Sequence, residues 1–475
     1  MVFSSLEFIY LFLPLVVIGY HLLCRFGFYR AAPLFLFSAS VFYYGYWNPA
    51  NTWLILASIV VNYLWSMLLF NVERYRKPVL IMGIALNLGA LCYYKYTDFF
   101  LGTANELFGA WFTLQHIVLP IGISFFTFQQ IAFLVDVYQG KMSGREGLSS
   151  YSLFVCFFPQ LVAGPIVHHR EMMPQFSSLE NRRFNWDNIY AGLVMFFLGL
   201  GKKVMVADSL SPVVGYCFDT SASLSFAEAW LGSLAYTLQL YFDFSGYSDM
   251  AIGCALLFNI HLPQNFLSPY KASNIQEFWR SWHITLSRWL RDYLYIPLGG
   301  NRKGERGTLR NLFITFLLGG LWHGAGWTFV AWGFLHGTAL CLHRVWSRWW
   351  GRKMPRVAGV FVTLMFVNFA WVVFRATSFS DALKVYGGML GQNGWVLGEA
   401  FTRTVALSTP SHGRLVIPGI VFLLGICLWG PNSTELTSKR MPHLAMTAWV
   451  TALGLSSLLL FLQANRVSEF IYFQF

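Results

Sequence analysis

Charged side chains are scarce in this chain. Of its 475 residues only 11% are charged, whereas 56% are hydrophobic and the mean hydropathy is +0.51. Soluble domains carry about 25% charged residues, so this chain lacks the polar surface to cover a globule of its size. The composition excludes a soluble enzyme, a disordered protein and a nucleic-acid-binding module, and it indicates a protein that crosses a membrane many times.

Cysteine pairs and the motifs of several enzyme classes are also missing. The seven cysteines are scattered without a CxxC pair, so neither a disulfide framework nor a zinc site is expected. The sequence contains no GxSxG, Walker, GxGxxG or HExxH motif, and no histidine is followed five positions later by aspartate. We therefore expect no metal and no permanently bound cofactor. An ATP-driven pump, a membrane zinc protease and the HxxxxD arrangement of peripheral lipid acyltransferases are disfavoured.

The charge that is present is mostly positive, and the net charge is +12. In a membrane protein such cations collect in cytoplasmic loops and rest on anionic headgroups, so they require no acidic partner. At the start of the chain Glu7 precedes an apolar run over 8–23, and the first cations, Arg25 and Arg30, follow it. A signal peptide has the opposite order. We predict an uncleaved first helix that starts outside and ends with Arg25 in the cytoplasm.

Long apolar runs predict an all-α polytopic membrane protein, because a membrane-spanning helix needs about 20 mostly apolar residues. We expect about eleven to thirteen membrane helices, some of them re-entrant or broken. The glycine- and proline-bearing stretches 119–122 and 158–165 are the candidates for irregular backbone. The runs begin near Phe8, Ala31, Trp53, Val79, Ile117, Tyr151, Ile189, Leu231, Asn311, Phe329, Val357, Leu415 and Met446.

The segment 274–296 reads as one amphipathic helix, with Ser273 or Asn274 as its N-cap. At about 100° per residue its arginines fall on one side and its tryptophans and leucines on the other. That pattern is typical of a helix in the membrane interface, and the basic loop over 299–311 places it on the cytoplasmic side. Its arginines could hold donor phosphates, because guanidinium pairs well with phosphate, or they could rest on anionic lipid. They are Arg280, Arg288 and Arg291.

Two histidines are candidates for chemistry. His323 lies near the centre of a predicted span over 311–332, and an ionisable residue at membrane depth is costly enough to suggest function. A neutral imidazole suits a general base, and the glycines beside His323 leave room for a substrate or a close backbone. The alternative is a histidine that only packs against a neighbouring helix. Taken alone, His283 and His336 are more simply explained as structural.

Two acids lie in an otherwise apolar stretch. Asp243 and Asp249 are six positions apart, so on one helix they would not share a face. A turn at 245–246 could bring them together. The alternative is that each pairs with an arginine or caps a broken helix, and the sequence leaves the two explanations open.

Several stretches along most of the chain resemble one family, the membrane-bound O-acyltransferases (MBOAT). More narrowly, they are similar to the bacterial subunit that supplies acetyl groups for alginate or cellulose O-acetylation. The stretches are MVFSS at 1–5, LPIGISFFTFQ at 119–129, FFPQLVAGPI at 157–166, QLYFDFSGYSDMAIG at 239–253, EFWRSWHITLSRWLRDYLYIPLGGNR at 277–302, LLGGLWHGAGWTFVAWGFLHG at 317–337 and WVVFRATSF at 371–379.

The resemblance implies roles for individual residues. His323 matches the active-site histidine of the family, and His283 matches a second polar position that is His or Asn. Asp243 and Asp249 match recurrent acids to which the resemblance assigns no role. For the tetrahedral oxyanion, either His283 or the indole N–H of Trp322 could donate a hydrogen bond. An acyl-enzyme intermediate stays open.

The resemblance also implies an architecture and partners. We expect one integral membrane domain over 1–475, a helical disc thinned by funnels that meet near the histidines. It would comprise N-terminal helices over 1–110, a catalytic core over 111–345 and C-terminal helices over 346–475. Acetyl-CoA is the expected donor on the cytoplasmic side. An SGNH-hydrolase-like partner in the periplasm of a Gram-negative bacterium would complete the transfer to a polysaccharide.

Two other functions compete with acetyl transfer. A transporter could export an acetyl carrier or a polymer, and internal repeats would favour it, but none is visible. A non-catalytic scaffold could dock a periplasmic enzyme, but it would gain nothing from costly intramembrane histidines. Within acetyl transfer, alginate, cellulose, another exopolysaccharide and a teichoic-acid-like D-alanyl acceptor all stay open.

Overall fold

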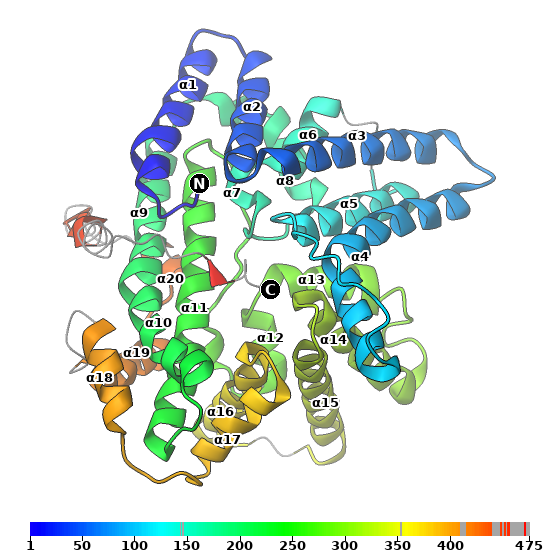
Figure 1. Cartoon of the computed structure of the whole chain (residues 1–475). Coiled ribbons are helices and arrows are strands. Elements are labelled where there is room, and N and C mark those ends of the chain that lie inside the picture. Colours follow the sequence, from blue (N-terminus) through cyan, green and yellow to red (C-terminus); the bar gives the residue numbers. More distant parts are fainter. Residues whose placement is uncertain are drawn as a thin grey trace. The chain divides into compact units, whose positions relative to one another are not determined.

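The computed structural model describes residues 1–142, 144, 147–351, 354–408 and 415–438, with short pieces at 447–448, 451–452, 454–456 and 470–471. Every regular element in these residues is a helix, which confirms the all-α prediction (Figure 1). The chain divides into two compact units. Unit 1 comprises Met1–Phe196 and Tyr247–Gln264, and unit 2 comprises Phe197–Gly246 and Asn265–Phe475.

Unit 1 contains the N-terminal helices, and each run predicted in this part of the chain corresponds to a helix. A π-helical turn, Glu7–Phe12, leads into the first α-helix, and a short 3₁₀ turn, Glu180–Arg182, precedes the last one, which continues into unit 2. The helices are α1 (Leu13–Arg25), α2 (Ala31–Trp47), α3 (Pro49–Asn71), α4 (Arg76–Phe108), α5 (Ile123–Tyr138), α6 (Leu148–Cys156), α7 (Phe158–Leu161), α8 (His169–Ser177) and α9 (Trp186–Gly201).

Irregular backbone occurs where the glycine and proline pattern predicts it. Gly122 has a φ of 73°, a conformation that L side chains rarely adopt, and it begins α5. A Cβ on this glycine would lie 3.1 Å from the carbonyl oxygen of Leu161. The second stretch follows a break at Phe157, between α6 and α7, and after the single turn of α7 it is non-helical from Val162 to its end. Gly122 therefore packs directly against the second irregular stretch.

Unit 2 contains the remaining helices, joined by π-helical turns at Lys202–Ala207, Tyr216–Thr220 and Arg291–Tyr295 and by a 3₁₀ turn at Pro269–Lys271. The run predicted from Met446 lies largely outside the described residues. The helices are α10 (Asp208–Gly215), α11 (Phe226–Leu256, which ends in unit 1), α12 (Ile275–Ser281), α13 (Ile284–Leu290), α14 (Gly304–His323), α15 (Trp327–Trp349), α16 (Arg356–Arg375), α17 (Phe379–Met389), α18 (Glu399–Ser408), α19 (Val416–Trp429) and α20 (Ser433–Ser438).

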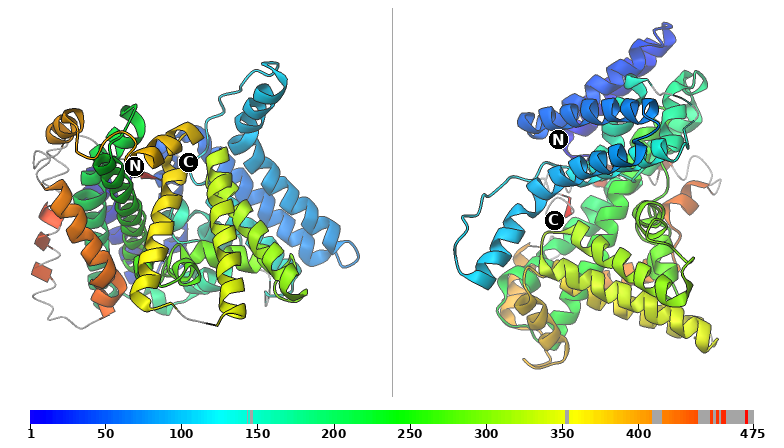
Figure 2. Two further views of the ribbon diagram at one scale, coloured as in Figure 1. Left: turned by 90° about the horizontal axis from the view of Figure 1, so that it is seen from below. Right: turned by 90° about the vertical axis from the view of Figure 1, so that its right-hand side faces the viewer.

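Several helices are built to cross a membrane. α3 and α4 run as a long pair (Figure 2), and most of their apolar side chains are not buried by other helices, as expected of helices in contact with lipid. The predicted count of about eleven to thirteen also included shorter or less apolar helices, and it stays a prediction. In the described residues five stretches are long and apolar enough to span: Glu7–Arg25, Pro49–Asn71, Arg76–Phe108, Trp186–Thr220 and Arg356–Arg375.

Candidate active site

His323 is the last residue of α14 and does not lie in the middle of a span. The helix ends there because Gly324 is extended, with φ −155° and ψ 151°, and Gly326 is extended as well. A Cβ on Gly324 would lie 2.1 Å from the ring of Phe329, so any other residue would require that ring to move. The predicted continuous span over 311–332 is therefore wrong, because its glycines separate two helices.

Two further glycines let the backbones of α14 and α15 touch. A Cβ on Gly320 would lie 2.4 Å from the carbonyl oxygen of Phe329, and one on Gly333 would lie 2.5 Å from that of Phe316. The two helices accordingly lie side by side (Figure 1). The sequence left open whether the glycines near His323 make room for a substrate or for a close backbone. At Gly320 they make room for the backbone of α15. This packing brings Trp332 of α15 against the end of α14.

Three aromatic rings enclose the imidazole of His323. Its ring centroid lies 4.9 Å from that of Trp322, 5.0 Å from that of Trp332 and 5.4 Å from that of Phe374. The interplanar angles are steep, at 67°, 84° and 75°, and only 5% of His323 is exposed. The rings come from α14, α15 and α16. They exclude bulk water from the imidazole and fix its orientation.

His283 interrupts the segment that the sequence predicts as one helix. Its φ of 43° and ψ of 53° are left-handed and separate α12 from α13. Asn274 caps α12 as predicted, since its Oδ1 accepts a hydrogen bond from the backbone N–H of Glu277 at 2.9 Å. The single interfacial helix over 274–296 is nevertheless wrong.

Asn265 supplies the physical reason for that break. Its side-chain Oδ1 accepts hydrogen bonds from the backbone N–H of Thr285 at 3.3 Å and from the Thr285 hydroxyl at 2.9 Å. The same Oδ1 lies 3.1 Å from Nδ1 of His283, and the backbone carbonyl of Asn265 accepts from the N–H of Ile284 at 3.0 Å. These bonds replace those that a continuous helix would make at Ile284 and Thr285. Because Asn265 is 18 residues upstream of His283, helical periodicity could not reveal them.

Trp322 connects the two candidate catalytic histidines. Its ring centroid lies 4.9 Å from that of His323 and 6.5 Å from that of His283. His283 is fully buried, and Phe244 packs edge-on against it at 4.7 Å. Phe470, near the end of the chain, packs in turn on Phe244 at 5.6 Å. Unit 2 thus brings His283, at the junction of α12 and α13, together with Trp322 and His323 at the end of α14.

The two predicted acids are not brought together. α11 runs without interruption through 245–246, so the turn that would join Asp243 to Asp249 does not form. Asp243 is fully buried and makes an ion pair with Lys203 at 2.7 Å, while Lys203 also pairs with Asp208 at 2.8 Å. The second oxygen of Asp243 accepts the backbone N–H of Ile471 at 3.0 Å. Asp243 therefore contacts Ile471, and its ion-pair partner is a lysine, whereas one of the two alternatives left open by the sequence was an arginine.

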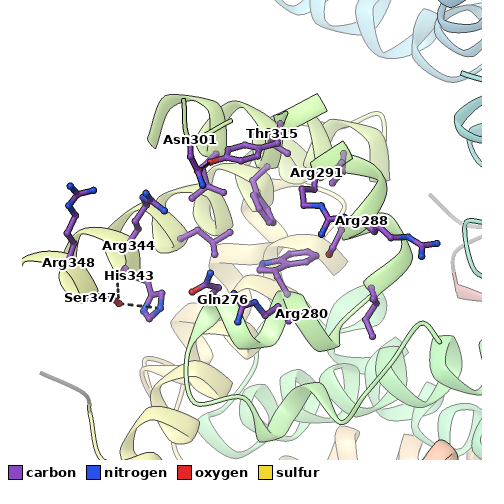
Figure 3. A pocket seen from close by; sticks show the side chains of 18 residues that line it. Gln276, Arg280, Arg288, Arg291, Asn301, Thr315, His343, Arg344, Ser347 and Arg348 are labelled. Carbon is purple, nitrogen blue, oxygen red and sulfur yellow. Dashed lines mark hydrogen bonds between the residues drawn. The ribbon is translucent and has the colours of Figure 1, made fainter. Parts of the chain in front are cut away.

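The three predicted arginines line one pocket of about 750 Å³ in unit 2. Figure 3 shows that the side chain of Arg288 extends away from the other basic residues of the pocket. Arg291 is paired with the neighbouring Asp292 at 2.7 Å. The described residues give Arg280 no carboxylate partner, so Arg280 is the predicted arginine best suited to bind an external anion.

Two further arginines line this pocket that the sequence analysis did not single out. Arg344 and Arg348 project from α15 and share one acceptor, Glu305, with N–O distances of 2.6 Å each. The hydrogen bond from Arg344 lowers the pKa of the Glu305 carboxyl below its usual value, with a further contribution from the charge of Arg348. Arg344 and Arg348 are four positions apart and therefore share one face of a helix, and this spacing is the feature of the sequence that could have indicated a paired basic site.

His336 is fully buried, and the indole Nε1–H of Trp279 donates a hydrogen bond to its Nδ1 at 3.1 Å. Its ring also lies 4.6 Å from Trp332, which in turn contacts His323 at 5.0 Å. Because the helix breaks at Gly324, His336 lies on a different helix from His323. Among the described residues no group of three His, Cys, Asp or Glu side chains could hold a metal ion.

Comparisons with known proteins give the site a context. Residues 142–380 match the membrane-bound O-acyltransferase family, MBOAT. The whole chain is 44% identical to a peptidoglycan O-acetyltransferase of Helicobacter pylori, covering 98% of that protein. It is 37% identical over its full length to a probable alginate O-acetylase AlgI of Pseudomonas putida, covering all of that protein. A teichoic acid D-alanyltransferase of Bacillus subtilis is 26% identical over 56% of this chain and 71% of that protein.

Proposed function

Because the chain belongs to the membrane-bound O-acyltransferase family, and so is a multi-pass membrane enzyme of acyl transfer, we propose that it transfers acetyl groups across the inner membrane. The proposed donor is acetyl-CoA on the cytoplasmic side. The proposed acceptor, reached through a periplasmic partner, is a polysaccharide of the cell envelope or an exopolysaccharide.

One observation carries the proposal. His323 is an imidazole held at a helix break inside three aromatic rings, with a second buried histidine beyond one of them. Burying two histidines away from water is costly, and an aromatic enclosure that excludes water suits a reaction in which water would hydrolyse the donor thioester. Helix packing alone does not need this arrangement.

The proposed reaction is acyl transfer from a thioester to a hydroxyl, with His323 as general base. His323 takes the proton of the attacking hydroxyl, the oxygen adds to the thioester carbonyl, and the carbon–sulfur bond then breaks. The CoA thiolate leaves and takes up the proton from the imidazolium, so the products are an acetyl ester and CoA thiol. A positioned base is worth roughly 10²- to 10⁴-fold, and each oxyanion donor about 10²- to 10³-fold.

The arginine pocket is the proposed place for the phosphates of CoA. Arg280, Arg344 and Arg348 offer planar guanidinium groups, which match phosphate oxygens better than ammonium groups do. Glu305 holds Arg344 and Arg348 in place before any ligand arrives. Anionic lipid headgroups have the same phosphate chemistry and are the alternative occupants.

The acceptor is proposed from the relatives. Those named peptidoglycan O-acetyltransferase and alginate O-acetylase match the full length of this chain, whereas the teichoic acid D-alanyltransferase matches about half of it. We therefore favour a polysaccharide over teichoic acid, and peptidoglycan joins alginate and cellulose among the candidates. Names of transferases also favour acyl transfer over the export of a carrier or polymer.

The test uses protein purified into nanodiscs with acetyl-CoA labelled in the acetyl group. We expect release of free CoA and loss of that release in His323→Ala, while size-exclusion profile and thermal unfolding stay close to those of the wild type. His261→Ala is the control, because that exposed histidine lies in unit 1, outside the described site. Normal release by His323→Ala would refute the base assignment. No release by the wild type, with or without the periplasmic partner, would refute acetyl-CoA as donor.

A further inference from the structure

The position of the proton on the imidazole of His283 follows from the atom of Asn265 that contacts its Nδ1. The backbone N–H of Thr285 can only donate, and it points at the same side-chain atom of Asn265 that contacts His283. That atom is therefore the amide oxygen and not the amide nitrogen. An amide oxygen only accepts, so its 3.1 Å contact with Nδ1 of His283 requires the proton to be on Nδ1. In a neutral imidazole Nε2 then carries the lone pair.

The surroundings keep this arrangement rigid. Asn265 and His283 are both fully buried, and Ile284 is bound to the backbone carbonyl of Asn265 at 3.0 Å. The left-handed backbone of His283 and the edge-on contact with Phe244, at an interplanar angle of 88°, fix the ring plane. The histidine therefore cannot exchange its two nitrogens by a ring flip without breaking several contacts.

We propose that Asn265 is a positioning residue that holds His283 in the Nδ1–H tautomer, so that His283 takes part in acyl transfer as an acceptor through Nε2. The inference rests on the proposed function and deepens it. In this tautomer His283 accepts a hydrogen bond or a proton from the substrate, and it has no N–H to offer an oxyanion from Nε2. The sequence left open whether His283 or Trp322 donates a hydrogen bond to the oxyanion. With His283 as an acceptor, that donor is the indole N–H of Trp322, which can only donate.

The first arm of the test needs no enzymatic activity. Protein with ¹⁵N-labelled histidine in nanodiscs is compared with His283→Gln, which identifies the His283 ring signals by their loss. We expect the wild type to show a protonated Nδ1 and an unprotonated Nε2. Asn265→Asp should keep that pattern, because a carboxylate oxygen also accepts from Nδ1, and Asn265→Leu should lose it. A wild-type protein with its proton on Nε2 would overturn the proposal whatever reaction the enzyme catalyses.

The second arm measures CoA release. Partners that fix a histidine tautomer contribute on the order of 10- to 100-fold or more, so Asn265→Leu should lower kcat by at least about tenfold with KM within about twofold. Asn265→Asp should restore most of kcat. The matched control is Thr285→Val, which removes another hydrogen bond to the same oxygen but leaves Nδ1 in place. If Asn265→Leu only lowers thermal stability, as Thr285→Val is expected to do, Asn265 has no positioning role.

The two arms separate this proposal from the proposed function. A wild type that releases no CoA but has the proton on Nδ1 contradicts the acetyl-CoA assignment and supports the tautomer. A wild type that releases CoA with a His323 dependence but has the proton on Nε2 supports the function and contradicts the role of Asn265.

Discussion

The buried carboxylate of Asp243 depends on one lysine for its stability. Lys203 is 4% exposed and lies between Asp243 and Asp208, so removing its ammonium group leaves the fully buried carboxylate of Asp243 without its cation. Breaking a buried ion pair from one side costs about 3–5 kcal/mol. We expect Lys203→Met to lower the thermal unfolding temperature strongly, measured on protein in nanodiscs.

Two variants make this measurement specific. Lys202→Met is the matched control, because the neighbouring ammonium donates to the hydroxyl of Ser433 at 2.6 Å and should cost only about 1 kcal/mol. The double variant Lys203→Met with Asp243→Leu should recover much of the loss, because no isolated charge is left. Equal effects of Lys202→Met and Lys203→Met would contradict the ion pair as the source of stability.

At the scale of single residues, the sequence indicated which histidines take part in the site, but it did not indicate the residues that hold them or the buried acid in place. His323 was selected because an imidazole at membrane depth is costly, and His283 because it matches a second polar position of the family that the chain resembles. The structure places both in one buried cluster. Asn265 was not selected, because a lone asparagine carries no motif, and its effect depends on a fold that returns it to Thr285. Lys203 was missed for the same reason: its partner Asp243 is forty positions away.

At the scale of the helix, α12 and α15 share a hydrogen bond from Trp279 to His336, and Trp279 also packs against Trp332 with ring centroids 5.7 Å apart. Trp279 also lines the arginine pocket, and His336 contacts Trp332, which borders His323. We expect His336→Leu to lower kcat and His336→Asn to retain more of it, because Oδ1 of asparagine can accept in place of Nδ1.

A double-mutant cycle measures whether the side chains of Trp279 and His336 are energetically coupled. Trp279→Phe and His336→Leu should each destabilise the protein, and the double variant should cost less than the sum by about 1 kcal/mol in the free energy of unfolding. Strictly additive effects would show that the two side chains contribute independently and that the bond does not link the helices.

Helix positions followed from the sequence more readily than helix breaks. Apolar runs near Phe8, Ala31 and Leu231 begin within a few residues of the corresponding helices, because length and hydropathy are local properties. The breaks at Gly324 and His283 were not predicted. Each depends on a group outside the local repeat: the ring of Phe329 in the first case and Asn265 in the second.

At the scale of the whole molecule, the excess of positive charge is concentrated in part around one pocket. If Arg344 and Arg348 hold CoA phosphates, Arg344→Gln should raise KM for acetyl-CoA by about tenfold or more and leave kcat nearly unchanged, since a charge-assisted hydrogen bond contributes about 1.5–3 kcal/mol. Added salt should raise KM of the wild type more than that of the variant.

The control for charge in general is Arg306→Gln, because this exposed arginine near the start of α14 does not line the pocket. We expect its KM to stay within about twofold of the wild-type value. If Arg344→Gln alters only the retention of anionic phospholipid during purification and not KM, the pocket binds lipid headgroups and CoA binds elsewhere.

The length of α4 has a consequence for the bilayer itself. Its 33 residues correspond to about 50 Å of helix, whereas the hydrocarbon core of a bilayer is about 30 Å thick. The helix must therefore tilt, bend or project into the headgroup region, and α3 packs beside it. A thinner membrane increases this mismatch and a thicker one relieves it, so α3 and α4 make the orientation of unit 1 sensitive to the thickness of the lipid around it.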